Sequence, residues 1–491
     1  MIFCQYRFLL LLMWLFTLHG SSAQKPTPEI GFKTLKDESQ QIRLETKGCI
    51  PTWLSGSLVA VGPSVFELNS STANYWLDGF AMAHSFTIAD CTVSYTNKLI
   101  DSFYYRDCCS KGKLRGSSPE KKSTWSKLTS ALSSNRPVYD NANMNIAQFN
   151  NELVALTETP LPQKLNATTL ETKGTFAFND QIDAQFASSH LIFDAQKNEW
   201  LGLAIHFGHN SDYIVYKMAH NSNQRVPVAK IAVSYPAYMH SFAASPSYII
   251  LTESPLSVSP YDLLMSDHSF IGTFKWQPKN GTNFIIIDRN TGKKVGTFKT
   301  DPFFVLHHVN AFEKDGNLVI DLIAYKDPSI VTQGFNYKNL LNLQGLPPAH
   351  LKRFTINIPQ KTVVDTQLAS HSIELPQINP KNNMREYQYV YATTGQDGIA
   401  QEIIKIDLKS NRHHSWHSKG CYVTEAVFVP KPGSSVEDEG VLLSIILDGY
   451  AKKSFLLILD AKTMKELGRA MVPHHVPFTI HSKFFNKLTH K

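Results

Sequence analysis

Short runs of apolar or alternating residues recur along the whole chain, and most of them end in turn-forming residues. Examples are LVALTETP (153–160), SYIILTESP (247–255), NFIIIDRNTGK (283–293), EIIKIDLKS (402–410) and SFLLILDAKT (454–463). Runs of this kind that close on Asp, Asn, Thr or Gly are typical of β-strands joined by tight turns. Long stretches with helical periodicity are scarce, so the pattern predicts an almost entirely β protein.

Three of these strands share one ending, in which an aspartate is followed after two residues by Thr or Ser. The aspartates are Asp288, Asp407 and Asp460. A side chain at this point accepts hydrogen bonds from the turn backbone, which marks a repeated hairpin. Many short strands without a linker favour a single β-propeller domain over residues 24–491 rather than tandem sandwiches. Their spacing is too irregular to count blades.

Four histidines stand far apart, each in its own predicted strand: His190 in SSHLIFD, His240 in YMHSFAA, His307 in FVLHHVNAFEKDG and His481 in VPFTIHSKFF. No local metal motif uses such spacing, but the innermost strands of a propeller line one axis, where distant residues can converge. Three glutamates stand in comparable settings: Glu158, Glu374 and Glu425. Neutral imidazoles bind ferrous iron, and carboxylates pair with the N–H that a bound imidazole leaves free. A lone strand histidine is more often a core or surface residue, so only the whole set indicates a metal site.

The N-terminus has the pattern of a targeting segment. Arg7 precedes the apolar run FLLLLMWLFTL, and the small residues Ser21 and Ala23 precede Gln24. The run is short for a transmembrane helix, so we expect a signal peptide over residues 1–23 and an exported protein, secreted, periplasmic or in the lumen of the secretory pathway. An uncleaved anchor is the alternative.

The remaining composition excludes some classes of partner. The net charge is +7 over 491 residues, and no basic block is dense enough to indicate nucleic-acid binding. One of the six cysteines, Cys4, lies in the expected signal peptide, which leaves an odd number and at least one free thiol or intermolecular bond. The oligomeric state is not determined by these features.

One basic segment, residues 106–134, differs from the rest. Its lysines precede Trp125, Leu128 and Leu132, which stand at helical spacing. A short amphipathic helix beside lysines can lie on a membrane surface. A solvated loop with one helical turn packed on the body explains the same pattern.

Several blocks together resemble the carotenoid cleavage oxygenase family, in the branch that holds the animal β-carotene oxygenases and the retinal pigment epithelium isomerohydrolase. They include IPTWLSGSLVAVGPSVFE, YWLDGFAMAHSF, YMHSFAASPSYIILTESP, HHVNAFEKDGNLVIDLIAYKD and EDEGVLLSIILD, in the family's order and approximate spacing from about residue 40 onward. The resemblance implies a seven-bladed β-propeller with a cap of loops and short helices over an iron face.

The resemblance also implies a site and a reaction. The iron ligands would be His190, His240, His307 and His481, with one Fe(2+) per chain, and the glutamates Glu158, Glu374 and Glu425 would support them. His308 would face away from the metal, because neighbours on a strand point to opposite sides. With three glutamates for four ligands, we expect His190 to lack a carboxylate. The reaction would be cleavage of a conjugated C=C bond of an apolar polyene, a carotenoid or apocarotenoid, by O2 to give aldehydes.

Some positions depart from the family pattern, and other functions stay open. Leu191 and Ser482 follow histidines that the family follows with Pro and Gly, and the region of Cys108 lacks the family's Pro-Asp-Pro-Cys-Lys stretch, which leaves membrane docking open. The alternatives are cleavage of a stilbene-type phenylpropanoid, non-oxidative isomerohydrolysis of a retinyl ester, and a propeller that binds without catalysis.

Overall fold

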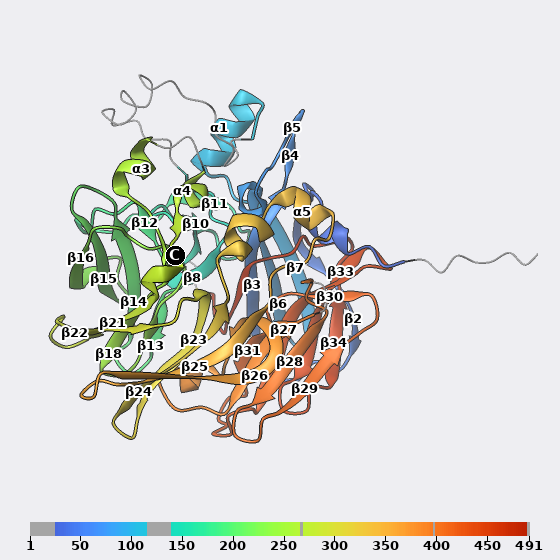
Figure 1. Cartoon of the computed structure of the whole chain (residues 1–491). Helices are drawn as coiled ribbons and strands as arrows, with labels where there is room; N and C mark the ends of the chain where they lie inside the picture. Colours follow the sequence, from blue (N-terminus) through green and yellow to red (C-terminus); the bar gives the residue numbers. More distant parts are fainter. Residues whose placement is uncertain (1–24, 115–138, 266–268, 396–397, 489–491) are drawn as a thin grey trace, which may run out of the picture.

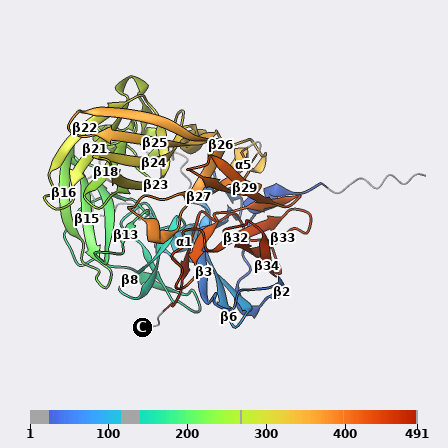
Figure 2. The ribbon, with the colours of Figure 1, turned by 90° about the horizontal axis from the view of Figure 1, so that it is seen from below.

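The protein is a β-propeller, seen in a computed structural model that describes residues 25–114, 139–265, 269–395 and 398–488. Within these residues the strands form seven antiparallel blades around one axis, which Figure 2 shows from below. The fold class predicted from the strand pattern and the resemblance is therefore confirmed.

The first four blades take up the N-terminal half of the chain and the C-terminal strand. The first blade contains β1 (Ser39–Arg43), β7 (Thr92–Leu99), β6 (Phe80–Ala89), β3 (Gly56–Val65) and β35 (His481–Phe485), and the second contains β8 (Asn145–Phe149), β9 (Glu152–Leu156), β10 (Gln163–Leu165) and β11 (Thr172–Thr175). The third blade contains β12 (Phe186–Ala187), β13 (Ile192–Asp194), β14 (Glu199–His206), β15 (Ser211–Ala219) and β16 (Val226–Val233). The fourth blade contains β17 (Ala243–Ala244), β18 (Tyr248–Glu253), β21 (Thr282–Asp288) and β22 (Lys294–Thr300).

The fifth and sixth blades share one long strand. The fifth contains β23 (Phe304–Lys314), β24 (Asn317–Tyr325), β25 (Ala349–Asn357) and the start of β26 (Thr362–Gln377); the sixth contains the end of β26 with β27 (Tyr389–Thr394), β28 (Glu402–Asp407) and β29 (Arg412–His417). Up to Ser372, β26 pairs with β25, and from Ile373 it pairs with β27. One strand is thus the outer edge of one blade and the inner edge of the next.

The two ends of the chain interlock to close the ring. The seventh blade contains β30 (Cys421–Val423), β31 (Val427–Pro430), β32 (Gly440–Asp448), β33 (Lys453–Asp460), β34 (Glu466–Met471) and the N-terminal strand β2 (Glu45–Gly48). β2 pairs with β34 of the last blade, whereas β35 pairs with β3 of the first. Each end of the chain thus adds a strand to the blade at the other end, and the edges of β34 and β3 are paired.

The repeated aspartate turns are present as predicted. Asp288 accepts hydrogen bonds from the backbone N–H of Asn290 and Thr291, and Asp407 and Asp460 close their turns in the same way. Each turn joins its strand to the next strand of the blade, which is the outermost strand after Asp288 and Asp407, whereas β2 lies outside β34 after Asp460.

Short helices lie at one end of the strands, in the upper part of Figure 1. They are α1 (Phe103–Lys111), α3 (Pro260–Met265), α4 (Phe270–Thr273) and α5 (Tyr337–Leu341), together with the two-residue pairs β4 (Glu67–Leu68) with β5 (Ser71–Thr72) and β19 (Leu256–Ser257) with β20 (Lys275–Trp276). The expected cap of loops and short helices is thus observed. The amphipathic segment that contains Trp125, Leu128 and Leu132 lies outside the described residues, as does the expected signal peptide.

Candidate metal centre

The four predicted histidines meet at the propeller axis. One nitrogen of each of His190, His240, His307 and His481 lies within 4.8 Å of the others. The Nε2 atoms of His190 and His240 are 2.9 Å apart, and those of His307 and His481 are 3.2 Å apart. Metal–nitrogen bonds of about 2 Å place adjacent ligands about 3 Å apart. The cluster therefore has the spacing of a four-imidazole metal site.

The histidines do not all lie in strands, which corrects the sequence-based prediction. His307 lies in β23 and His481 begins β35, but His190 lies between β12 and β13 and His240 precedes β17. Hydroxyl groups next to the two histidines link neighbouring blades: Ser188 Oγ donates to the carbonyl of His240, and Ser241 Oγ donates to that of Leu306. The sequence pattern does not reveal these contacts between blades.

Each of the three glutamates accepts a hydrogen bond from a different histidine. Glu158 lies 2.7 Å from Nδ1 of His240, Glu374 lies 2.5 Å from Nδ1 of His307, and Glu425 lies 3.0 Å from Nδ1 of His481. When Nδ1–H donates to a carboxylate, the lone pair of Nε2 is free to face the centre. Among the described residues no carboxylate bonds to His190.

The carboxylates are themselves held by other groups. The Tyr238 hydroxyl donates to Glu158, and the Tyr325 hydroxyl donates to Glu374 at 2.6 Å. Glu425 accepts from Gln377 Nε2 and from the backbone N–H of Ser482. Sequence reasoning missed Tyr238 and Tyr325. The spacing of Tyr238 and His240 was the available signal, because residues two apart in an extended segment share a face.

Burial and the paired charges set the protonation of the centre. Burial, and then the neighbouring histidines, hold the pKa of His190 well below its ordinary value. Burial also lowers the pKa of His481, whereas Glu374 overcomes burial and raises the pKa of His307. Although burial acts to raise the pKa of Glu374, its contact with His307 lowers it, and His481 lowers that of Glu425 in the same way. At Glu374 and Glu425 the contact with histidine thus favours the ionised carboxylate over the protonated acid.

Other histidines near these segments have structural contacts. His308 points away from the cluster, as predicted, and its ring contacts the hydroxyls of Ser241 and Thr252. Burial, with a contribution from His307, lowers the pKa of His308 to about 3. His84 lies in the core of the first blade, 2.8 Å from the Tyr95 hydroxyl, and does not line the cavities described below.

Two adjoining cavities lie near the histidines. The first has a volume of about 470 Å³ and is lined by His240, His307 and His481 and by apolar residues that include Phe335, Leu346 and Ile480. The second has a volume of about 400 Å³, and Thr157 and Glu158 lie in its wall. Both cavities are lined by Tyr75, Leu77, Met144 and Tyr238. The metal site thus opens into the first cavity, and the second cavity adjoins the first at these four shared residues. The two cavities are called the arms below.

The arms point toward the helical end of the propeller. Phe270 and Ile271 of α4 line the second cavity, and Leu340 of α5 lines the first. Within the described residues no helix is long and apolar enough to cross a membrane, and no disulfide joins the cysteines.

Comparison with known proteins identifies the family. The family model described as "Retinal pigment epithelial membrane protein" matches residues 32–486. Human beta,beta-carotene 15,15'-dioxygenase is 30% identical over 92% of this chain and 94% of that protein. Carotenoid isomerooxygenase of Galleria mellonella is 29% identical over 90% of this chain and 93% of that protein. The chain belongs to this family, which confirms the resemblance inferred from the motifs.

Solved structures give the same fold. A mutant of the Synechocystis apocarotenoid oxygenase superposes with a TM-score of 0.84 at 24% identity and covers 94% of this chain and 100% of its own. The cobalt-substituted form of that oxygenase superposes with a TM-score of 0.83.

The comparisons contradict the expected export of the chain. Relatives from Mustela putorius furo, Macaca fascicularis and Homo sapiens, each 27% identical over 92% of this chain, are named as mitochondrial carotenoid-cleaving dioxygenases, and nothing in the matches indicates export. The prediction was wrong because it took a short apolar run after one arginine as an export signal. Receptors read targeting segments, and hydropathy alone does not specify the compartment.

Proposed function

We propose that this chain is an Fe(II)-dependent dioxygenase that cleaves a conjugated C=C bond of a carotenoid or apocarotenoid with O2 and releases aldehydes. The observation that carries the proposal is the four-histidine cluster at the wall of an apolar cavity. Family membership supports it, since matched relatives are named as carotene dioxygenases and as a carotenoid isomerooxygenase. Because these names describe oxygenases, oxidative cleavage is favoured over non-oxidative isomerohydrolysis.

In this proposal His190, His240, His307 and His481 hold one iron ion through Nε2. Four neutral ligands leave the charge of the metal uncompensated, and the three paired carboxylates Glu158, Glu374 and Glu425 restore part of the balance and fix the rings. Four histidine ligands would leave room at the ion for O2 or substrate. When bound, Fe(II) supplies the one-electron chemistry that O2 requires.

The remaining residues bind and orient the substrate. A polyene is long and apolar, and the two cavities that meet at Leu77 and Met144 offer it a matching path on either side of the metal. Their apolar walls exclude water from the centre, which strengthens the contacts between histidines and carboxylates. The depth to which the polyene enters each arm selects the bond.

We further propose that the end of the propeller at α3 and α4 contacts a membrane surface from which the substrate enters. Tyr261 is 67% exposed and Phe270 is 41% exposed, and Phe270 also lines the second cavity. Exposed aromatic residues at a cavity mouth suit an interface where an apolar ligand leaves a bilayer. Residues 24–491 would act as one domain, since β2 and β35 each complete a blade at the other end of the chain.

Product analysis tests the proposal. The iron-loaded chain in detergent is offered a carotene, an apocarotenal, a retinyl ester and a stilbene, with and without O2, and products are identified by mass. The proposal predicts aldehydes from a carotenoid only when O2 is present. Retinol released without O2 would replace it with isomerohydrolysis. Products from the stilbene alone would assign the phenylpropanoid reaction.

A further inference from the structure

His190 is held differently from the other three histidines of the centre. Those three donate Nδ1–H to a carboxylate, whereas no described carboxylate bonds to His190. His190 also lies outside a strand, so no ladder fixes its backbone. Other contacts must therefore hold the backbone segment on which this ring stands.

The hydroxyl of Ser188 makes one such contact. Its Oγ accepts from the backbone N–H of His190 at 3.2 Å and donates to the backbone carbonyl of His240 at 2.6 Å. Ser188 is 3% exposed, so water does not compete for these bonds. One hydroxyl therefore joins the backbones of two histidines that belong to different blades.

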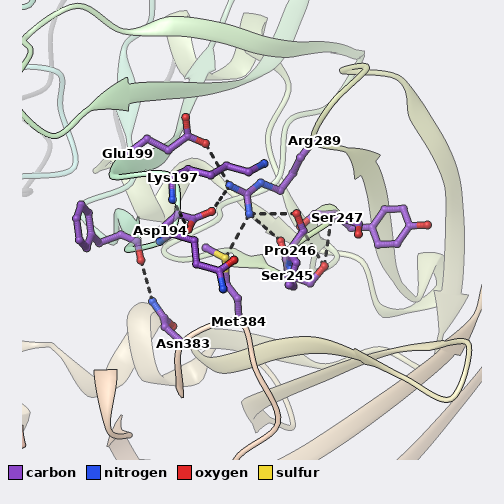
Figure 3. A network of polar contacts seen from close by, with 12 residues as sticks. Asp194, Lys197, Glu199, Ser245, Pro246, Ser247, Arg289, Asn383 and Met384 are labelled. Atoms are coloured by element: carbon purple, nitrogen blue, oxygen red, sulfur yellow. Dashed lines mark hydrogen bonds and ion pairs between the residues drawn. The ribbon is translucent and has the colours of Figure 1, made fainter. Parts of the chain in front are cut away.

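The same segment is anchored further along the chain. Asp194 accepts from Arg289 Nη2 at 2.6 Å, and Nη1 of Arg289 donates to the carbonyl of Ser245 at 2.9 Å, which Figure 3 shows. Both side chains of this ion pair are buried. The segment with His190 is thus tied to the segment with His240 twice, at Ser188 and at Arg289.

We propose that Ser188 is a positioning residue for the metal centre. It helps to position His190, as the glutamates help to position the other three histidines. It acts through the backbone, by fixing the segment on which the ring stands against the carbonyl of His240. This inference rests on the proposed metal-binding function. Without the hydroxyl, three imidazoles would keep their positions, and the segment that carries the imidazole of His190 would be held less firmly.

The neighbouring residue offers a matched control. Ser189 is 1% exposed, and its hydroxyl is buried without a hydrogen-bond partner. Ser188→Ala and Ser189→Ala therefore remove the same atom from adjacent buried positions. Only the first change removes a bond between two metal-binding segments.

The experiment measures Co(II) binding by the purified full chain, the two alanine variants and the metal-free forms. We expect Ser188→Ala to bind Co(II) on the order of tenfold more weakly. Its visible absorption spectrum, which reports coordination, should change as well. Ser189→Ala should match the unchanged chain in affinity and spectrum. Urea unfolding of the metal-free forms separates this effect from a loss of fold stability.

Each outcome decides the inference. An unchanged affinity and spectrum in Ser188→Ala, or equal changes in both variants, would overturn it. If Ser188→Ala does not fold, Ser188→Thr, which keeps the hydroxyl, takes its place: native-like Co(II) binding supports the inference, and its loss in a folded Ser188→Thr chain refutes it. Failure of the unchanged chain to bind metal would instead refute the proposed function.

Discussion

The Nδ1 atom of His240 lies 2.7 Å from the carboxylate of Glu158, although 82 positions separate the two residues in the chain. His240 precedes the inner strand of the fourth blade, and Glu158 follows a strand of the second. The contact therefore spans the third blade at the axis, where distant segments converge. The same convergence joins His307 to Glu374 and His481 to Glu425.

Glu158→Gln should weaken iron binding and lower the turnover rate on the order of 10–100-fold. Glu158 accepts from both His240 and the Tyr238 hydroxyl, and a glutamine keeps an acceptor oxygen but loses the negative charge that strengthens these bonds and offsets the charge of the metal. Metal titration and steady-state rates measure the effect. Glu171→Gln, at an exposed position, is the control and should leave both unchanged. Equal metal affinity in the two variants would contradict the role of Glu158.

Two ion pairs of equal length should differ strongly in their contribution to stability. Lys405 contacts Asp438 at 2.7 Å with side chains 5% and 9% exposed, and Lys431 contacts Glu439 at 2.7 Å with side chains 46% and 37% exposed. Lys405→Met leaves the buried carboxylate of Asp438 without its cation and should lower the free energy of unfolding by about 3–5 kcal/mol. Lys431→Met should cost less than about 1 kcal/mol. Urea unfolding of the two variants compares them, and similar losses would refute the argument.

His84 should make the fold sensitive to acid. Burial, with His474 and His475 nearby, lowers its pKa from 6.5 to about 3. As the pH falls below the pKa of His84 in the unfolded chain, the unfolded chain binds a proton but the folded chain does not. The free energy of unfolding therefore decreases until the pH reaches about 3. The slope from this group approaches about 1.4 kcal/mol per pH unit.

His84→Gln tests this pH dependence because glutamine can still bond to the Tyr95 hydroxyl and does not titrate. Urea unfolding of the metal-free chain at pH 7 and pH 5 should show a smaller loss of stability in the variant than in the unchanged chain. An equal loss in both would show that other groups carry the acid sensitivity.

Leu77→Trp should block the junction of the two cavities. Leu77 lines both of them, and a larger side chain there occupies the space between the arms. We expect turnover of a long polyene to fall more than about tenfold, since the bond to be cut no longer reaches the centre. Metal content should stay the same because Leu77 contacts none of the four histidines through a hydrogen bond. Unchanged turnover would mean that the substrate takes another path.

The fold class and the candidate site residues could be predicted because the strands, the turns and the histidine motifs each have a local sequence pattern. Period-two strands, the turns at Asp288 and Asp460, and the motifs around His307 and His481 could all be read directly. The convergence of the four histidines followed from the geometry of a propeller.

Contacts that depend on three-dimensional neighbours could not be predicted. Ser188 is one serine of a pair, and no pattern separates its bonding hydroxyl from the unpartnered one of Ser189. The position of His190 and His240 outside the strands was likewise not visible, because both residues stand in segments with a strand-like sequence pattern. The failure to predict the compartment has a different origin, because a targeting segment is read by a receptor and not by the fold.

Metal analysis of the purified chain tests the central claim most directly. Iron is quantified in the unchanged chain, in His307→Ala and in the control His414→Ala, whose histidine is exposed on β29. The account predicts one iron per chain in the unchanged protein and in His414→Ala, and neither iron nor O2-dependent cleavage in His307→Ala. Iron retained together with full activity in His307→Ala would contradict it.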